Sequence, residues 1–221
     1  MSIQVKICGI TSADAADAVV RAKADIAGLM LHPRSPRHLP PEQAVALAAR
    51  MRGRARLAIV LVDPDDETLA AAIAAVKPDF IQLHGGETPA RVGAIRSRFG
   101  VAVIKVIPVA EAADFAEAPR YEEAADMLMF DAKPPPGASR EGGLGAAFDW
   151  QILKGRKFAR PWLLAGGLDP DNVARAIRLA GAPGVDVSSG VEAAPGVKSA
   201  ELIAQFTAAA KAAHTANGTP A

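Results

Sequence analysis

Short apolar runs alternate along this chain with longer stretches in which apolar residues recur at helical spacing. The apolar runs are rich in β-branched residues, as expected of parallel strands that are covered on both faces. Eight such runs predict strands at residues 3–8, 26–31, 57–62, 80–83, 101–107, 127–131, 162–165 and 185–188. The stretches after them predict helices at residues 13–23, 41–51, 67–76, 89–99, 110–125, 150–154, 170–180 and 199–214. Asp65, Thr88 and Asp169 stand just before three of these helices, where a helix-capping side chain is favoured.

Eight consecutive strand–helix units in 221 residues predict a single-domain α/β fold, the (β/α)₈ or TIM barrel. A doubly wound open sheet is the alternative that the pattern leaves open. We expect the barrel to span residues 1–214 and the small, polar residues 215–221 to form a disordered tail. The longest predicted loop, residues 132–147, follows the sixth strand and has the length of a functional lid.

The charge balance narrows the class of partner. The chain holds 25 basic and 24 acidic residues, which argues against binding to nucleic acid or to an anionic membrane surface. No apolar run approaches the length of a membrane span, and the N-terminus enters a predicted strand without the layout of a signal peptide. We therefore expect a compact cytoplasmic protein.

The only cysteine, Cys8, ends the first predicted strand and is followed by a glycine. Barrels and open sheets both keep their chemistry at the carboxyl ends of their strands. A single cysteine excludes an intrachain disulfide and an all-cysteine metal site, so Cys8 is either a buried small side chain or a reactive thiol. We do not expect Lys6 to lower the pKa of this thiol, because side chains two residues apart share a face only where the strand stays regular to its end.

Two further strand ends carry acidic residues. Asp131 follows a wholly apolar run, and we expect partial desolvation to favour its protonated, proton-donating form. The alternative is a carboxylate tied to Lys133 or to loop amides. Asp186 lies between two valines and points opposite to them, either into the barrel or towards the loops as a hydrogen-bond acceptor.

Candidate binding groups follow the other strands. Glycine-rich turns after strands seven and eight suit a phosphate, although such turns are also ordinary connections; they hold Gly166, Gly167, Ser188, Ser189 and Gly190. Arg34 and Arg37 suit a carboxylate, unless their loop is merely solvated. His84, which follows Gln82, is expected to donate from the pocket wall. The histidines lack metal-ligand spacing, so we expect no metal site.

Seven segments in chain order together resemble the phosphoribosylanthranilate isomerase family of tryptophan biosynthesis. They are residues 5–11, 33–37, 82–85, 130–133, 148–150, 164–168 and 184–192, and the resemblance runs from residue 3 to about residue 210. The most distinctive parts read Cys-Gly-Ile-Thr, from Cys8, and Asp-Val-Ser-Ser-Gly, from Asp186.

The resemblance implies a barrel enzyme without metal or organic cofactor, a monomer or homodimer whose partner is a small phosphorylated substrate. It implies the Amadori rearrangement of N-(5-phosphoribosyl)anthranilate to 1-(2-carboxyphenylamino)-1-deoxyribulose 5-phosphate, the third step from chorismate to tryptophan. In the family, the residue matching Asp131 is the general acid and the residue matching Cys8 is the general base. Arg37 matches the residue that holds the anthranilate carboxylate. The remaining matches imply that Gln82, His84 and Asp186 bind the substrate and that Gly166, Gly167, Ser188, Ser189 and Gly190 bind its phosphate.

The chain departs from the family pattern in two places. His32 stands where the family usually has an aromatic residue, and residues 142–147 lack the usual lysine and hydroxyl side chains. Both departures bear on substrate affinity. Two other functions stay open: a related isomerase of histidine synthesis, which uses paired aspartates where this chain has Cys8, and a barrel that only binds a phosphorylated ligand.

Overall fold

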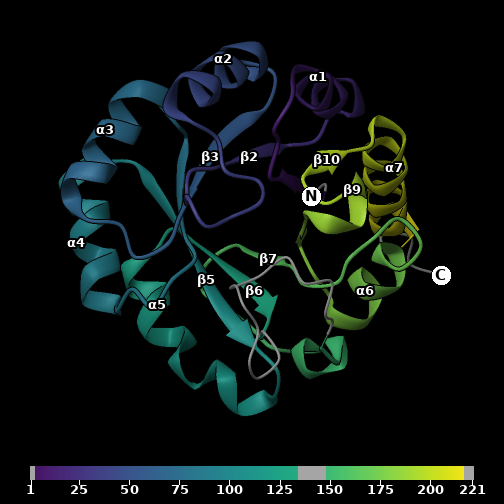
Figure 1. Cartoon of the computed structure of the whole chain (residues 1–221). Helices are drawn as coiled ribbons and strands as arrows, with labels where there is room; N and C mark the ends of the chain where they lie inside the picture. The colour runs from purple at the N-terminus through teal and green to yellow at the C-terminus, as the bar shows by residue number, and fades with distance from the viewer. Residues whose placement is uncertain (1–2, 134–147, 217–221) are drawn as a thin grey trace.

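The computed structural model describes residues 3–133 and 148–216. Eight parallel strands close into a barrel in chain order, with β1 paired to both β2 and β8 (Figure 1). This confirms the predicted barrel and excludes the open sheet. The strands are β1 (Gln4–Cys8), β2 (Ile26–Met30), β3 (Arg56–Leu61), β4 (Phe80–Leu83), β5 (Ala102–Val109), β6 (Met127–Ala132), β7 (Trp162–Leu164) and β8 (Gly184–Val187).

Helices surround the barrel as an outer ring (Figure 1). The α-helices are α1 (Ala13–Ala22), α2 (Pro41–Met51), α3 (Asp66–Val76), α4 (Pro89–Phe99), α5 (Ala118–Ala124), α6 (Val173–Ala180) and α7 (Ala200–Ala216). Two predicted caps are confirmed, because the side chains of Asp65 and Thr88 accept from the first turns of α3 and α4. The predicted helices 41–51 and 89–99 have the observed bounds.

Three predicted helices match to within two residues at each end, and three others differ more. Residues 110–125 divide into a 3₁₀ helix, η1 (Ala112–Glu117), and α5, which begins at Ala118 with Pro119 in its first turn. Proline has no N–H to continue a helix but suits a first turn, so it marks the division. Residues 150–154 form the 3₁₀ helix η2 (Trp150–Leu153). The helix at 170–180 begins at Val173, because the Asp169 carboxylate accepts from the next two available N–H groups and forms a turn there.

The core has two layers. Alternate strand residues fill the barrel interior with a small apolar cluster: Ile26, Ala58, Phe80, Ile104, Val106, Met127, Met129, Leu163 and Ala165. The other strand faces pack against the helices in a larger cluster. Four buried polar side chains, Lys6, Gln82, Asp131 and Asp186, come from the strands around this interior. The interior is therefore apolar over most of its length and polar around β1, β4, β6 and β8.

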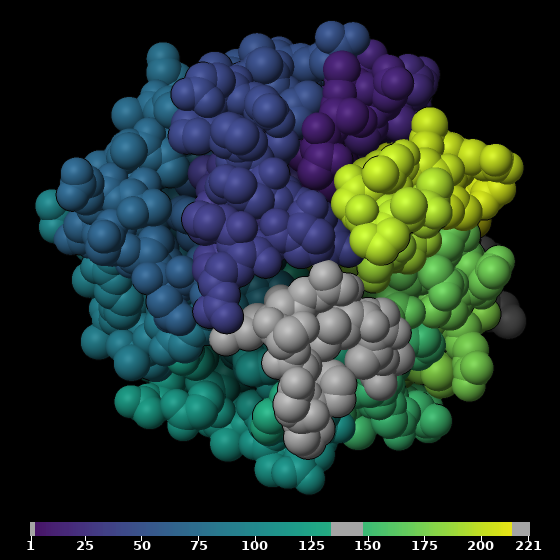
Figure 2. Space-filling view, in the orientation of Figure 1, coloured from purple at the N-terminus to yellow at the C-terminus, as the bar shows by residue number. Residues whose placement is uncertain are grey.

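A short hairpin follows β8 that the sequence analysis does not predict. After the 3₁₀ turn η3 (Ser189–Val191), β9 (Glu192–Ala194) pairs antiparallel with β10 (Val197–Lys198). The C-terminal residues, yellow in Figure 2, lie beside the purple N-terminal residues, so the barrel closes where the chain's two ends meet.

Two expectations concern residues outside the described ranges. The predicted lid at 132–147 lies outside them from residue 134 onwards. Of the predicted tail at 215–221, residues 215 and 216 belong to α7, so the expected disorder is wrong for these two, and the residues from 217 onwards lie outside the described ranges. Within the described ranges, no helix has both the length and the apolar character needed to cross a membrane.

Candidate active site

Cys8 lies at the carboxyl end of β1 and is 6% exposed. The strand stays regular to this point, with Lys6 opposite Ile26 and Cys8 opposite Gly28. A methyl group on Gly28 would lie 2.9 Å from the Cys8 Sγ and 3.2 Å from the Lys6 Nζ. The thiol and the ammonium therefore face the same small space, which the glycine leaves open.

Lys6 is the charged neighbour of this thiol. Its side chain is fully buried, and its Nζ lies 2.7 Å from the Oδ1 of Asp186, the residue opposite Lys6 on β8. Asp186 points into the barrel, as its alternation with two valines predicts. The partner of the Asp186 carboxylate is the Lys6 ammonium, a pairing that the sequence does not predict.

Burial and charge act in opposite directions on these groups. Burial raises the pKa of the Cys8 thiol, and the Asp186 charge raises it further. Lys6 and Lys198 lower it, but the balance leaves this pKa above its ordinary value. Burial also lowers the pKa of Lys6, but the negative charges of Asp186 and of the Cys8 thiolate outweigh burial and leave it raised. Lys6 consequently stays charged beside the thiol.

Asp131, at the end of β6, is 8% exposed. Its Oδ1 accepts from the N–H of Ala132 at 2.9 Å, and its Oδ2 lies 3.3 Å from the Nε2 of His84. The other ring nitrogen, Nδ1, lies 3.2 Å from the Gln82 amide nitrogen. Gln82 and His84 thus form a chain of contacts from β4 to Asp131. Of the alternative partners predicted for Asp131, Lys133 is wrong, because Lys133 pairs with Asp114, whereas a backbone amide, that of Ala132, is confirmed.

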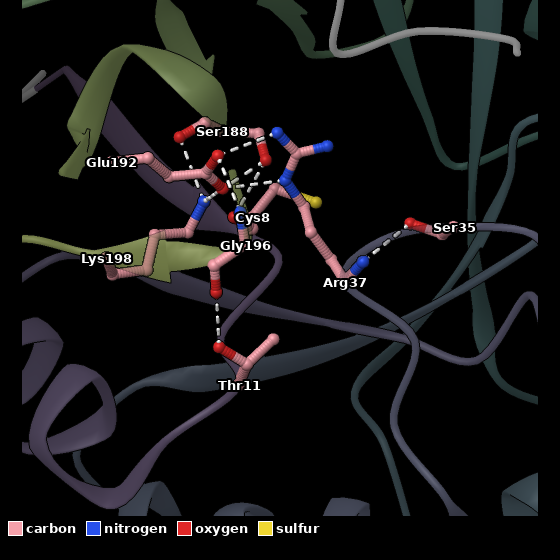
Figure 3. Close-up of polar contacts among 8 residues, drawn as sticks. All are labelled: Cys8, Thr11, Ser35, Arg37, Ser188, Glu192, Gly196 and Lys198. Carbon is pink, nitrogen blue, oxygen red and sulfur yellow. Dashed lines mark hydrogen bonds and ion pairs between the residues drawn. The ribbon is translucent and has the colours of Figure 1, made fainter. Parts of the chain in front are cut away.

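Arg37 is buried, while Arg34 in the same loop is exposed. The stem of Arg37 packs beside Gly9, where an added methyl group would lie 2.5 Å from its Cδ. Its Nε and Nη2 donate to the two carboxylate oxygens of Glu192 at 2.7 and 2.9 Å (Figure 3). The solvated-loop alternative therefore does not hold for Arg37, whose guanidinium is fixed next to the loop that carries Cys8.

Glu192 joins Arg37 to the turn after β8. Lys198 donates to the Glu192 Oε1 at 2.6 Å and to the backbone oxygen of Ser188 at 2.9 Å (Figure 3). Burial raises the pKa of Glu192, but hydrogen bonds from Arg37 and Lys198 outweigh burial and lower that pKa to about 2. Burial lowers the pKa of Lys198. The hydrogen bond and the charge of Glu192 raise this pKa, but burial outweighs them.

The two glycine-rich turns lie against each other at the same end of the barrel. Gly166 and Gly167 both have positive φ, at 88° and 63°. An added methyl group on Gly190 would run into the backbone oxygen of Leu168, so the turns after β7 and β8 are in contact. Ser188 also donates to the backbone oxygen of Cys8 at 3.2 Å, which ties the second turn to the thiol's loop. Ser189 and Gly190 lie in η3.

Three residues of the site have no role in the sequence analysis: Lys6, Glu192 and Lys198. The expectation that Lys6 does not lower the pKa of Cys8 is wrong, because β1 stays regular to its end and places residues 6 and 8 on one face. The pairing of Glu192 with Arg37 depends on the hairpin, which no local pattern in the sequence announces. Within the described ranges, no group of three or more His, Cys, Asp or Glu side chains is arranged to hold a metal ion.

Comparison with known proteins gives a consistent result. The model of the family described as N-(5′phosphoribosyl)anthranilate (PRA) isomerase matches residues 5–209. An N-(5′-phosphoribosyl)anthranilate isomerase of Azorhizobium caulinodans is 52% identical over 217 residues, which cover 98% of this chain and 95% of that protein.

Solved structures agree with this result. Monomers generated from the dimeric phosphoribosylanthranilate isomerase of Thermotoga maritima superpose with a TM-score of 0.82 at 32% identity, covering 95% of this chain and 99% of theirs. A phosphoribosylanthranilate isomerase in complex with reduced 1-(o-carboxyphenylamino)-1-deoxyribulose 5-phosphate also has a TM-score of 0.82, at 33% identity and with the same coverage of both chains.

Proposed function

The chain belongs to the N-(5′-phosphoribosyl)anthranilate isomerase family, and from this membership we propose that Cys8 and Asp131 are its catalytic base and acid. The protein is an isomerase of tryptophan biosynthesis that performs the aldose–ketose rearrangement of phosphoribosylanthranilate. One observation carries the residue assignment. Cys8, Asp131, Arg37 and both glycine-rich turns come from the carboxyl ends of the barrel strands or from the loops directly after them.

Asp131 acts first in this scheme, by protonating the furanose ring oxygen. The bond from the anomeric carbon to that oxygen then breaks, and the nitrogen lone pair forms an iminium. The Oδ2 of Asp131 lies 3.3 Å from the Nε2 of His84, so the imidazole holds the carboxyl group in place. Gln82 orients the imidazole from its other side.

Cys8 acts second, as a base. The iminium acidifies the neighbouring C2′–H bond, and the thiolate takes that proton while the electron pair forms an enol amine. The enol amine then tautomerises to the ketone. No bond forms between sulfur and substrate, which separates this role from that of a nucleophilic cysteine.

The remaining residues hold the substrate in this proposal. The Arg37 guanidinium binds the anthranilate carboxylate through the nitrogen outside its pair with Glu192, Nη1. Backbone N–H groups of the two glycine-rich turns bind the phosphate, with contributions from Ser188 and Ser189. Asp186 binds a sugar hydroxyl in this proposal while it pairs with Lys6.

We further propose that the protein acts in the cytoplasm as a monomer or a homodimer. A relative from Thermotoga maritima is described as dimeric. Sedimentation equilibrium of the purified chain tests the oligomeric state, because a single mass that rises to twice the chain mass with concentration identifies a dimer.

The first test is an isomerase assay in which phosphoribosylanthranilate is generated in place and its fluorescence loss is followed. We expect turnover by the natural sequence, and a loss of at least ~10²-fold in kcat in both Cys8→Ser and Asp131→Asn, as is usual for a positioned acid or base. Binding should change less, because both side chains act in the transition state.

Asp17→Asn is the matched control for Asp131→Asn. Asp17 forms an exposed ion pair with Arg50 on the outside of α1, and exposed pairs contribute little to stability. We expect normal turnover in this variant. Near-normal kcat in Cys8→Ser would remove Cys8 from the mechanism, and a folded natural chain without turnover would contradict the proposed substrate.

A further inference from the structure

The proposed reaction needs a thiolate at a place where the protein disfavours one. Cys8 is buried, and burial makes the charged form of a thiol less stable than its neutral form. A base must nevertheless hold its negative charge before it takes a proton. Some group close to the sulfur therefore has to stabilise the thiolate.

Lys6 has the right position and chemistry for this task. A methyl carbon added to Gly28 would lie 3.2 Å from the Lys6 Nζ and 2.9 Å from the Cys8 Sγ, so both atoms border the same small space. An ammonium has three N–H donors and no acceptor, and Asp186 takes one of them at 2.7 Å. The Lys6 side chain is fully buried, so water cannot accept from the N–H groups that remain.

We propose that Lys6 is the positioning residue of the catalytic base: held by Asp186, its buried ammonium donates to the Cys8 sulfur and stabilises the thiolate form. This proposal rests on the proposed role of Cys8 as the base. In this scheme Lys6 acts on the reaction only through Cys8, so it is a positioning residue and not a catalytic one.

The charges around the sulfur give the proposal a sharp signature. Lys6 on β1 and Lys198 on β10 favour the thiolate, whereas Asp186 on β8 disfavours it. Loss of the Lys6 charge and loss of the Asp186 charge should therefore shift the Cys8 pKa in opposite directions. A purely structural role of the ion pair predicts the same direction for both variants, because either change loosens the same packing.

Alkylation of Cys8 by iodoacetamide measures the thiolate without any substrate. The thiolate is the reacting form, and Cys8 is the only cysteine, so the rate at each pH reports this residue alone. Cys8→Ser gives the blank. We expect Asp186→Asn to raise the alkylation rate near neutral pH, and Lys6→Gln to lower it by at least ~10-fold, the effect of a pKa rise of one unit.

Lys6→Gln leaves the Asp186 carboxylate buried without its partner, which endangers folding. The double variant Lys6→Gln/Asp186→Asn avoids this, because both members of the pair become neutral amides. Compared with Asp186→Asn alone, the double variant should alkylate at least ~10-fold more slowly, with the same circular dichroism.

Two results would overturn the proposal. The first is an equal alkylation rate in Asp186→Asn and the double variant. The second is a change of the alkylation rate in the same direction in Lys6→Gln and in Asp186→Asn. The isomerase assay on the natural chain is independent of these rates. Its failure, with the alkylation pattern intact, would contradict the proposed function and leave the contact between Lys6 and Cys8 standing.

Discussion

At Arg37, one guanidinium serves both the fold and the proposed substrate. Its Nε and Nη2 are occupied by Glu192, which fixes the plane of the group and its direction. A preoriented guanidinium loses less side-chain freedom when it binds a second carboxylate. The pairing with Glu192 is therefore compatible with substrate binding and prepares Arg37 for it.

Replacement of Arg37 should separate binding from turnover. We expect Arg37→Ala to raise KM at least ~10-fold, since a charge-assisted hydrogen bond contributes about 1.5–3 kcal/mol, and to change kcat less. Arg34→Ala is the matched control, because Arg34 lies in the same loop but is exposed. Steady-state kinetics decide the question, and an unchanged KM in Arg37→Ala would leave Arg37 with a structural role only.

Gly28 has no side chain, and this leaves space for the Cys8 thiol and the Lys6 ammonium. In Gly28→Ala, the new methyl group would press on the Cys8 sulfur at 2.9 Å and on the Lys6 ammonium at 3.2 Å. We expect kcat to fall at least ~10-fold, because a displaced base no longer reaches its proton, and stability to fall by about 1–3 kcal/mol through overpacking. Kinetics and urea unfolding measure the two effects.

Gly93→Ala provides the control for this substitution. Gly93 lies within α4, where a new methyl group would meet another side chain only at 3.9 Å. Alanine is the better helix former, so this variant should keep its turnover and gain slight stability. Normal kcat in Gly28→Ala would show that the space beside Cys8 is not needed.

The sequence singles out most residues of the candidate site but not the pairs that they form. Cys8, Asp131 and Arg37 could be chosen because each follows a strand end, where barrels keep their chemistry. Partners such as Lys6 with Asp186 depend on strand register, which pairs residues that are 180 positions apart. A single sequence does not contain that register explicitly.

At the scale of elements, the β9–β10 hairpin joins loops from both ends of the chain. Gly196 in its turn donates its N–H to Glu192, and its backbone oxygen accepts from the Thr11 hydroxyl at 2.7 Å (Figure 3). Its φ is +80°, and an added methyl group would lie 3.0 Å from the backbone oxygen of Pro36. The hairpin therefore sets the distance between the Arg37 loop and the turn after β8.

We expect Gly196→Ala to weaken substrate binding through this hairpin. The positive φ alone destabilises alanine by about 1 kcal/mol. The contact with Pro36 should add to this loss and raise KM severalfold by shifting the Arg37 loop. Gly181→Ala is the matched control, with φ +67° and open space around the new methyl group. Equal KM values in the two variants would contradict a positioning role for the hairpin.

Element prediction succeeded where the pattern is local and failed where it is not. All eight strands were predicted, because runs of β-branched residues buried on both faces are distinctive. The division at Pro119 and the late start of α6 reflect competing turn and cap chemistry within a helical pattern. The hairpin escaped prediction because its strands are only three and two residues long.

At the scale of the whole molecule, the buried charge network around Glu192 links stability to pH. Burial raises the pKa of Glu192, yet Arg37 and Lys198 lower it to about 2 from the ordinary value of 4.5. A lowered pKa in the folded state means that this carboxylate stabilises the fold above its ordinary pKa. That contribution is lost as the pH falls from about 4.5 through about 2.

Urea unfolding at about pH 5 and about pH 3 measures this contribution. Linkage predicts that the natural chain loses about 2 kcal/mol more free energy of unfolding over this interval than Glu192→Gln does. Glu201→Gln, on the exposed first turn of α7, is the control and should lose as much as the natural chain. If Glu192→Gln loses just as much, the carboxylate does not govern acid stability. Such a result would require the unfolded chain to have the same lowered pKa at Glu192. The unfolded chain lacks the hairpin that brings Arg37 and Lys198 to this carboxylate, so we expect its pKa there to be the ordinary one.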